Sequence, residues 1–170
     1  MVWYKANYPK TVAEVLNDNI KFRSATNNAI IKFKLSKPWK GTRKEIKKKF
    51  RTLCHDLAEV YGIKEPRLEF GEPYEFEIPL LNGAVLPSIS CYLPKSNKIY
   101  LESEYDGKYS VVVLLHEFAH ALHKDERQAC RWSINLFRKH FPKSYAKLIP
   151  RRHLLYRPKS PKLKQQPGLN

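Results

Sequence analysis

The sequence feature that most constrains the fold is the most apolar segment of the chain, Tyr109 to His123, YSVVVLLHEFAHALH. Apolar residues occur on every side of a helix drawn through it, and a helix that is hydrophobic all round is usually buried. The segment is shorter than the roughly 18 residues that a membrane-spanning helix needs. We therefore predict a buried helix at the centre of a globular domain.

Within this segment, His116 and His120 belong to an HExxH sequence. Side chains four residues apart on a helix lie nearly one above the other, so both imidazoles can bind one ion. Glu117 projects about 100° away from His116, where a general base for a zinc-bound water belongs. The alternative is a set of core residues that satisfy one another, but a carboxylate and two imidazoles in apolar surroundings need several partners. A zinc ion compensates all three, so we predict a Zn²⁺ site.

Catalytic zinc usually takes three protein ligands and leaves a fourth position open, so a third ligand is required. Glu126 is the best candidate because it follows His120 by six residues, just beyond a predicted turn. Asp125 is the near alternative, and His140 is a weaker one. His123 continues the helical series, but three ligands on one straight helix would spread along its axis, so we place it at the rim.

Periodicity and turn residues give the remaining elements. Thr42 with Glu45 forms a capping box for a helix that ends at Gly62. The other predicted elements are a helix near Thr11–Asn19, a strand over Asn28–Leu35, strands over Arg67–Phe70 and Glu75–Ile78, a hairpin of Ser88–Leu93 with Lys98–Leu101, and a helix over Glu126–Phe141 that Pro142 stops. The pattern predicts an α+β fold with a small, mostly antiparallel sheet, a buried helix and a second helix backing it.

The chain is strongly basic, with 32 Lys and Arg against 16 Asp and Glu. Residues 127–170 hold twelve of these cations and no acid, so this region predicts a nucleic-acid partner, with a solubilising tail as the alternative. We interpret the run Lys47, Lys48, Lys49 and Arg51 as a solvated helix face rather than a binding site.

Three widely spaced cysteines argue against a disulfide framework and against a thiolate zinc site. The first ten residues, MVWYKANYPK, lack the apolar core of a secretory signal. We therefore expect a soluble, cytoplasmic protein that does not bind a membrane.

The stretch Ser90–Phe137 resembles the catalytic core of the zincin metallopeptidases, with a strand hairpin followed by HEFAHALH. The segment ERQACRWSINLF resembles the ExxAxxFA pattern of ImmA/IrrE-like peptidases, with Glu126, Ala129, Trp132 and Ser133 in the matching places. In that family the glutamate is the third zinc ligand. His123 departs from the metzincin pattern, which has glycine there, and the resemblance covers less than a third of the chain.

The resemblance implies a zincin-like fold and a zinc-dependent metallopeptidase that hydrolyses peptide bonds. His116, His120 and Glu126 would hold Zn²⁺, and Glu117 would be the catalytic general base. The oxyanion-stabilising group is left open among Tyr92, Tyr105, Tyr109 and His123, and an arm of the hairpin could pair with an extended protein or peptide substrate.

Two alternatives to this function stay open. One is a protease tethered to DNA, similar to SprT-like proteases, although those generally use a third histidine. The other is a basic nucleic-acid-binding or virion-associated protein in which zinc only stabilises the fold. We expect an N-terminal extension or subdomain over residues 1–42, a catalytic domain over 43–149 and a basic, flexible tail over 150–170.

Overall fold

A computed structural model of the chain describes the backbone of residues 12–71, 77–79, 85–87, 90–102, 107–149 and 157–158. Its helices are α1 (Ser24–Leu35), α2 (Arg43–Tyr61), α3 (Gly107–Ala121), α4 (Glu126–His140) and α5 (Pro142–Tyr145), after a 3₁₀ turn, η1 (Val12–Glu14). Its strands are β1 (Arg67–Gly71), β2 (Glu77–Pro79), β3 (Val85–Pro87), β4 (Ser90–Leu93), β5 (Lys98–Glu102), β6 (Leu148–Ile149) and β7 (Arg157–Pro158). These elements confirm the predicted α+β class.

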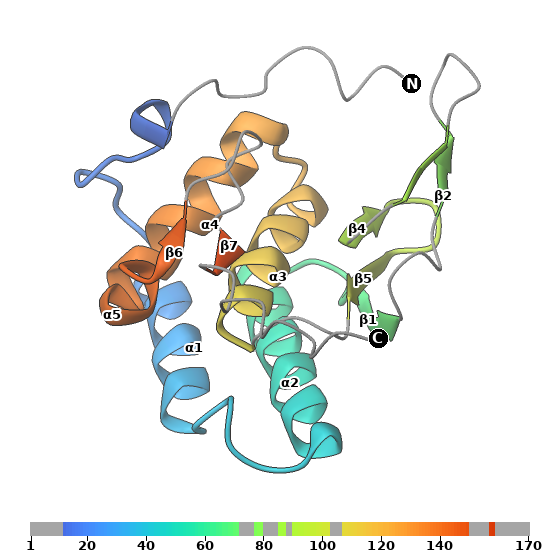
Figure 1. The fold of residues 1–170 in the computed structure, drawn as a ribbon, viewed down its shortest axis with the longest axis horizontal. Helices are drawn as coiled ribbons and strands as arrows, with labels where there is room; N and C mark the ends of the chain where they lie inside the picture. Colours follow the sequence, from blue (N-terminus) through green and yellow to red (C-terminus); the bar gives the residue numbers. More distant parts are fainter. Residues whose placement is uncertain are drawn as a thin grey trace, which may run out of the picture.

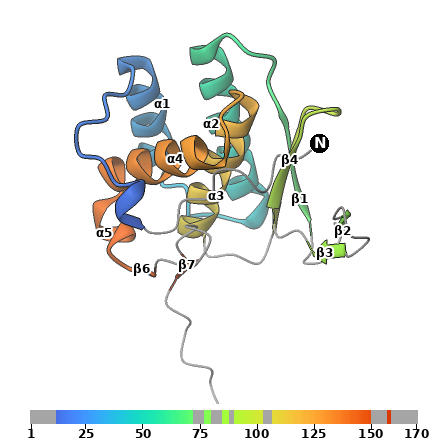
Figure 2. The same cartoon turned by 90° about the horizontal axis from the view of Figure 1, so that it is seen from above.

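The main sheet has three strands in the order β1-β5-β4 and lies on one side of the helices (Figures 1 and 2). Strands β4 and β5 form the predicted antiparallel hairpin, with Cys91 opposite Tyr100. Strand β1 pairs with β5 in the parallel direction, so the sheet is mixed. Strands β2 and β3 pair separately, as do β6 and β7. The hairpin therefore presents β4 as an outer strand of the main sheet next to α3.

Helix α2 begins and ends where the sequence predicts. The Thr42 side chain accepts a hydrogen bond from the Glu45 N–H, and the Glu45 carboxylate accepts one from the Thr42 N–H, which completes the capping box. Gly62 ends the helix in the left-handed conformation, with φ 61°. One face of the helix joins the core through Phe50, Leu53, Cys54, Leu57 and Ala58.

The predicted strand over Asn28–Leu35 is wrong, because these residues belong to helix α1. Apolar residues alternate with Lys32 and Lys34 there, which matches the period of a strand. The buried residues instead recur at intervals of three and four: Thr26, Ala29, Ile30 and Phe33. That spacing is one face of a helix.

The predicted helix near Thr11–Asn19 is also wrong, because the described part forms only the three-residue turn η1. The Asn17 side chain accepts a hydrogen bond from the Asn19 N–H at 2.8 Å, and such local bonds compete with helix formation. Asn135 on α4 then holds the segment, donating to the Val15 carbonyl at 2.7 Å. Val15 is fully buried in the core, so this segment is tied to α4.

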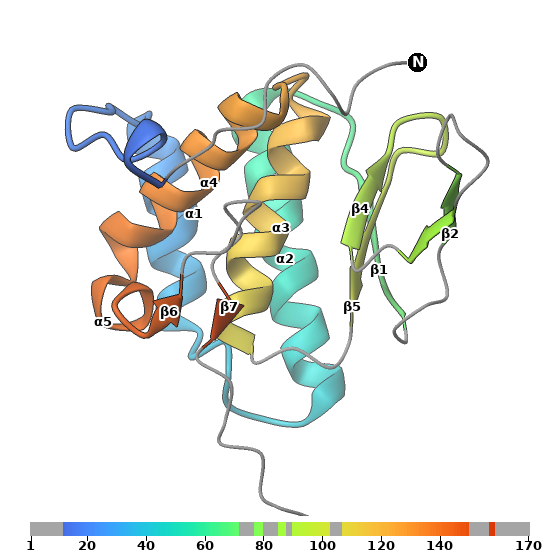
Figure 3. The ribbon, with the colours of Figure 1, turned by 45° about the horizontal axis from the view of Figure 1, so that its top comes forward.

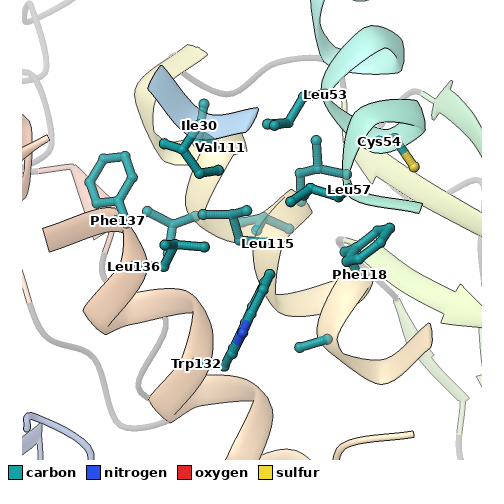
Figure 4. Packing of buried hydrophobic residues seen from close by; sticks show 14 of the residues in the cluster. Ile30, Leu53, Cys54, Leu57, Val111, Leu115, Phe118, Trp132, Leu136 and Phe137 are labelled. Carbon is teal, nitrogen blue, oxygen red and sulfur yellow. The ribbon is translucent and has the colours of Figure 1, made fainter. Parts of the chain in front are cut away.

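Helix α3 is the predicted buried helix, and α4 backs it. Helix α3 packs against α4 and against strands β4 and β5 (Figure 3). Phe118 on α3 packs with Trp132 of α4 and Tyr61 of α2, and its ring centroid lies 6.4 Å from each of theirs; Figure 4 shows Phe118 and Trp132. Leu114, Leu115 and Phe118 have no solvent exposure. The core thus surrounds α3 on all sides, as its apolar sequence requires.

Helix α4 ends at His140, and Pro142 opens the short helix α5, so the predicted stop is confirmed. Within the described residues, none of the helices combines the length and the hydropathy that crossing a lipid bilayer requires. The domain boundaries at residues 42 and 149 stay predictions. Apart from residues 157–158, the predicted tail lies outside the described residues.

Candidate metal centre

Three side chains from α3 and α4 converge on one point. The Nε2 atoms of His116 and His120 lie 3.1 Å apart. Glu126 brings Oε1 to 3.0 Å from Nε2 of His116 and Oε2 to 3.1 Å from Nε2 of His120. The structure therefore brings together the three predicted ligands, and this His/His/Glu group can hold a metal ion.

The turn between α3 and α4 directs the chain back toward the histidines. His123 has φ 60°, a left-handed conformation that glycine usually adopts at this position after a helix. The Lys124 N–H bonds the Ala119 carbonyl at 3.1 Å, and the His123 N–H bonds the His120 carbonyl at 2.9 Å. These two bonds form a Schellman motif, which reverses the chain within a few residues.

Asp125 begins α4 as its N-cap. Its carboxylate accepts a hydrogen bond from the Gln128 N–H at 2.8 Å, and Oε1 of Gln128 accepts one from the Asp125 N–H at 3.1 Å. Asp125 is thus used in a capping box, which fixes Glu126 as the first residue of α4. The cap therefore positions Glu126 opposite the end of α3, and Asp125 is outside the ligand group that includes Glu126.

The outer nitrogens of the two imidazoles have different partners. Nδ1 of His120 lies 3.0 Å from the Lys124 carbonyl oxygen, to which it donates. Nδ1 of His116 lies 3.7 Å from Sγ of Cys130, which also lies 3.9 Å from Oε1 of Glu126. The Lys124 carbonyl can only accept, so it orients His120 and selects the tautomer with a free Nε2, and Nε2 of His116 lies 3.1 Å from that atom. The two Nε2 atoms therefore face the shared point.

Cys130 is a residue of the site that the sequence reasoning missed. It follows Glu126 by four residues, so both lie on one face of α4, and that spacing was the available signal. Burial, followed by the charges of Glu126 and Glu117, raises the pKa of the Cys130 thiol well above its usual range. The group is therefore a protonated thiol beside the ligands.

The three side chains form a largely buried charge cluster. Burial opposes ionisation of Glu126, but hydrogen bonds and attraction from His116 and His120 hold its pKa well below the usual range. Burial likewise opposes protonation of His120, but the bond to Glu126 and attraction from Glu117 raise its pKa to about 9. The Glu126 carboxylate therefore stays ionised beside the two imidazoles.

Glu117 lies beside this group rather than in it. The residue is only 6% exposed, and burial raises the pKa of its carboxyl despite the opposing effect of the histidines. The backbone of Tyr92 on β4 gives the Glu117 carboxylate a hydrogen bond. Glu117 is therefore held between α3 and the outer strand of the sheet, one residue from a ligand.

The other described residues that the sequence offers for the site lie outside the group of His116, His120 and Glu126. Nε2 of His140 lies 2.8 Å from Oδ1 of Asn27 on α1, outside the ligand group. The Tyr92 hydroxyl donates to Oδ1 of Asn97 within the hairpin. Tyr109 is 2% exposed and belongs to the core, while Tyr105 lies outside the described residues.

Comparison of the chain with protein-family models, with curated proteins and with solved structures found no match. The interpretation of the site therefore rests on its own geometry.

Proposed function

We propose that this protein is a zinc-dependent metallopeptidase, with His116, His120 and Glu126 as the zinc ligands and Glu117 as the general base. The observation that carries the proposal is the placement of Glu117, a buried carboxylate held by β4 immediately beside three convergent ligand atoms. A purely structural metal site has no use for an additional buried carboxylate at that place.

The donor set and its spacing fit zinc. Two imidazole nitrogens and one carboxylate oxygen form one of the known ligand sets of catalytic zinc, and they leave a fourth position for water. Tetrahedral bonds of about 2.0–2.1 Å separate two ligand atoms by about 3.3 Å. The two Nε2 atoms are 3.1 Å apart and Oε1 of Glu126 lies 3.0 Å from Nε2 of His116, both close to that value, and the three ligand atoms all lie within 4.8 Å of one another. The group can therefore receive the ion with small adjustments of side chains.

Each residue then has a defined task. When bound, zinc supplies Lewis-acid activation of water near neutral pH and polarises a carbonyl oxygen. The carboxylate of Glu117 accepts the proton of the attacking water and passes it to the leaving amine. The backbone of Tyr92 orients that carboxylate, and the Lys124 carbonyl orients His120. The apolar core around α3 excludes bulk water from one side of the centre.

The test combines metal content with peptide-bond hydrolysis. We expect purified protein to bind one zinc ion and to hydrolyse fluorescein-labelled casein. Glu117→Gln keeps the size and the hydrogen-bonding capacity of the side chain, so it should keep zinc and lose at least about 100-fold in rate, the lower range for general acid–base catalysis. Glu59→Gln, an exposed residue on α2, is the matched control.

Full activity of Glu117→Gln, or absence of zinc binding by the wild type, would overturn the proposal. Stoichiometric zinc without hydrolysis of casein or of a mixed peptide library would favour the structural-zinc alternative.

A further inference from the structure

A second region of the molecule concentrates positive charge away from the metal centre. Residues 32–51 contain ten Lys and Arg and a single acid, Glu45. Six of these cations are exposed around the α1–α2 connection and the first half of α2, and we name this group the basic surface: Lys37, Lys40, Arg43, Lys44, Lys48 and Arg51. Figure 1 shows this connection at the opposite end of the helices from the α3–α4 turn.

Two cations on α4 pair with acids near the N-terminal end of the described chain. Arg127 pairs with Glu14 at 2.7 Å, and Arg138 pairs with Asp18 at 2.5 Å. Glu45 is the one acid of residues 32–51, and its carboxylate accepts a 2.6 Å hydrogen bond from the Thr42 N–H. The surface therefore keeps a high local positive charge.

The placement of these cations opposes the stability of the helix that carries them. Arg43 and Lys44 lie in the first turn of α2, where the helix dipole favours anions. Lys44 and Lys48 are four residues apart, and like charges at that spacing repel one another. A partner rich in negative charge would remove both penalties. The arrangement is thus suited to binding rather than to the stability of the free protein.

The loop that presents the basic surface is held in a fixed shape. Nζ of Lys49 donates to the carbonyl oxygens of Lys37 at 3.1 Å and Lys40 at 2.6 Å. Lys37 adopts a left-handed conformation with φ 52°, which is uncommon for a non-glycine residue. Gly41 has φ 114°, and a Cβ there would lie 2.6 Å from Oε2 of Glu45. A preorganised loop loses less conformational entropy on binding.

We infer that the basic surface binds the phosphate backbone of a nucleic acid. Lysine and arginine side chains bind phosphates without reading the base sequence, and they release counterions on doing so. A membrane is the less suitable polyanion, because surface-bound helices insert an apolar face. The exposed large apolar side chains of the described chain, Ile31 and Leu35, lie on α1 before this surface.

The experiment measures binding of the full-length protein to a fluorescein-labelled 24-nucleotide strand and to the corresponding duplex, across a salt series. Lys40→Ala, Lys44→Ala and Lys48→Ala are combined in one variant. Two further triple variants remove the same charge elsewhere: Lys21→Ala with Lys64→Ala and Lys95→Ala, and Lys159→Ala with Lys162→Ala and Lys164→Ala. The second tests the region 127–170 that the sequence favours.

We expect the wild type to bind at least one of the two probes. The basic-surface variant should bind at least about 20-fold more weakly, and its log–log salt slope should fall by about 2 to 3. Circular dichroism and zinc content should stay unchanged, because all three positions are exposed and alanine favours the helix at Lys44 and Lys48.

Equal weakening by either control variant would overturn the inference, as would an unchanged salt slope. Binding to vesicles containing phosphatidylserine, without binding to either oligonucleotide, would assign the surface to a membrane and also overturn it.

Discussion

Helices α2 and α3 pack into the same core, but they place ionisable side chains in opposite surroundings. Lys44 and Lys48 of α2 are exposed, whereas His116 and Glu117 of α3 are only 3% and 6% exposed. Water screens the charges on α2, so the fold does not need to pair each one. A buried charge requires a specific partner. The difference explains why the geometry of the candidate centre is closely determined, while the basic surface is defined mainly by its charge.

The largest change in the free energy of unfolding should follow from removing a buried side chain of α3. Phe118→Ala removes an unexposed ring that contacts Tyr61 and Trp132, and we expect the free energy of unfolding to fall by about 3–5 kcal/mol. Lys44→Ala on the exposed side should change it by no more than about 0.5 kcal/mol. Urea denaturation followed by circular dichroism measures both. Similar losses of unfolding free energy in the two variants would show that the buried face of α3 and the exposed face of α2 do not differ in their contribution to stability.

The second prediction concerns the charge that compensates the buried histidines. Glu126→Gln replaces the carboxylate that lies 3.0–3.1 Å from both imidazoles, so zinc affinity should fall more than about 100-fold, or about 2.7 kcal/mol. Asp125→Asn keeps a good N-cap residue and should bind zinc nearly as tightly as the wild type. Competition with a chelating indicator measures both affinities. A larger loss in the Asp125 variant would exchange the roles of the two acids.

The sequence predicts the features that local spacing determines. The i,i+4 relation of His116 and His120 follows from helix geometry alone, and the position of Glu126 follows from a short turn. The capping box of α2 is likewise a pattern of neighbouring residues, Thr42 and Glu45. Each of these features involves residues close together along the chain, and the structure places each as predicted.

Features that depend on distant contacts were not predicted. The i,i+4 spacing places Cys130 on the same face of α4 as Glu126, but its contact with His116 forms only because α4 folds back on α3. The alternation of lysines with apolar residues in α1 predicts a strand, but Ile31 and Leu35 of that pattern are exposed on a helix. Burial against α2 decides which side chains of α1 face the core, and a single sequence contains that information only indirectly.

The third prediction concerns the group that contacts Nδ1 of His116, the ring nitrogen that faces away from the ligand group. Cys130→Ala removes the group nearest to Nδ1 of His116, so zinc affinity should fall about 10-fold, at the lower end for such partners. Cys54→Ala is the matched control, because Cys54 is equally buried but donates to the Pro66 carbonyl. Isothermal titration with zinc measures both. Equal affinities in the two variants would show that Cys130 only fills space.

A fourth, smaller effect tests the local stabilisation of α2. Thr42→Ala removes the side-chain oxygen that accepts the Glu45 N–H, and we expect a loss of about 1 kcal/mol in unfolding free energy. Zinc affinity should stay unchanged, because the cap lies at the opposite end of the helices from the centre. Thr42→Ser retains the hydroxyl and should restore most of the stability. A Ser variant as unstable as the Ala variant would contradict the capping role.

The smallest effect concerns His140, which has a depressed pKa but lies outside the ligand group. Burial, with repulsion from Lys139 and Lys34, lowers its pKa, and Nε2 donates to Oδ1 of Asn27 at 2.8 Å. The unfolded chain therefore binds this proton more readily than the folded protein does. Stability from this source is complete above the unfolded pKa of about 6.5 and declines as pH falls toward the lower folded value.

His140→Gln removes that proton equilibrium while it keeps a donor for Asn27. The wild type should consequently lose more stability than His140→Gln when the pH is lowered from 7.5 to 5.5, and urea denaturation at both values measures the difference. The contribution of His120 is shared by the two proteins and cancels in the comparison. Equal losses of stability in the two proteins would mean that His140 binds a proton equally well in the folded and the unfolded state. Partial burial on α4 would then not restrict the charge of a side chain as full burial on α3 does.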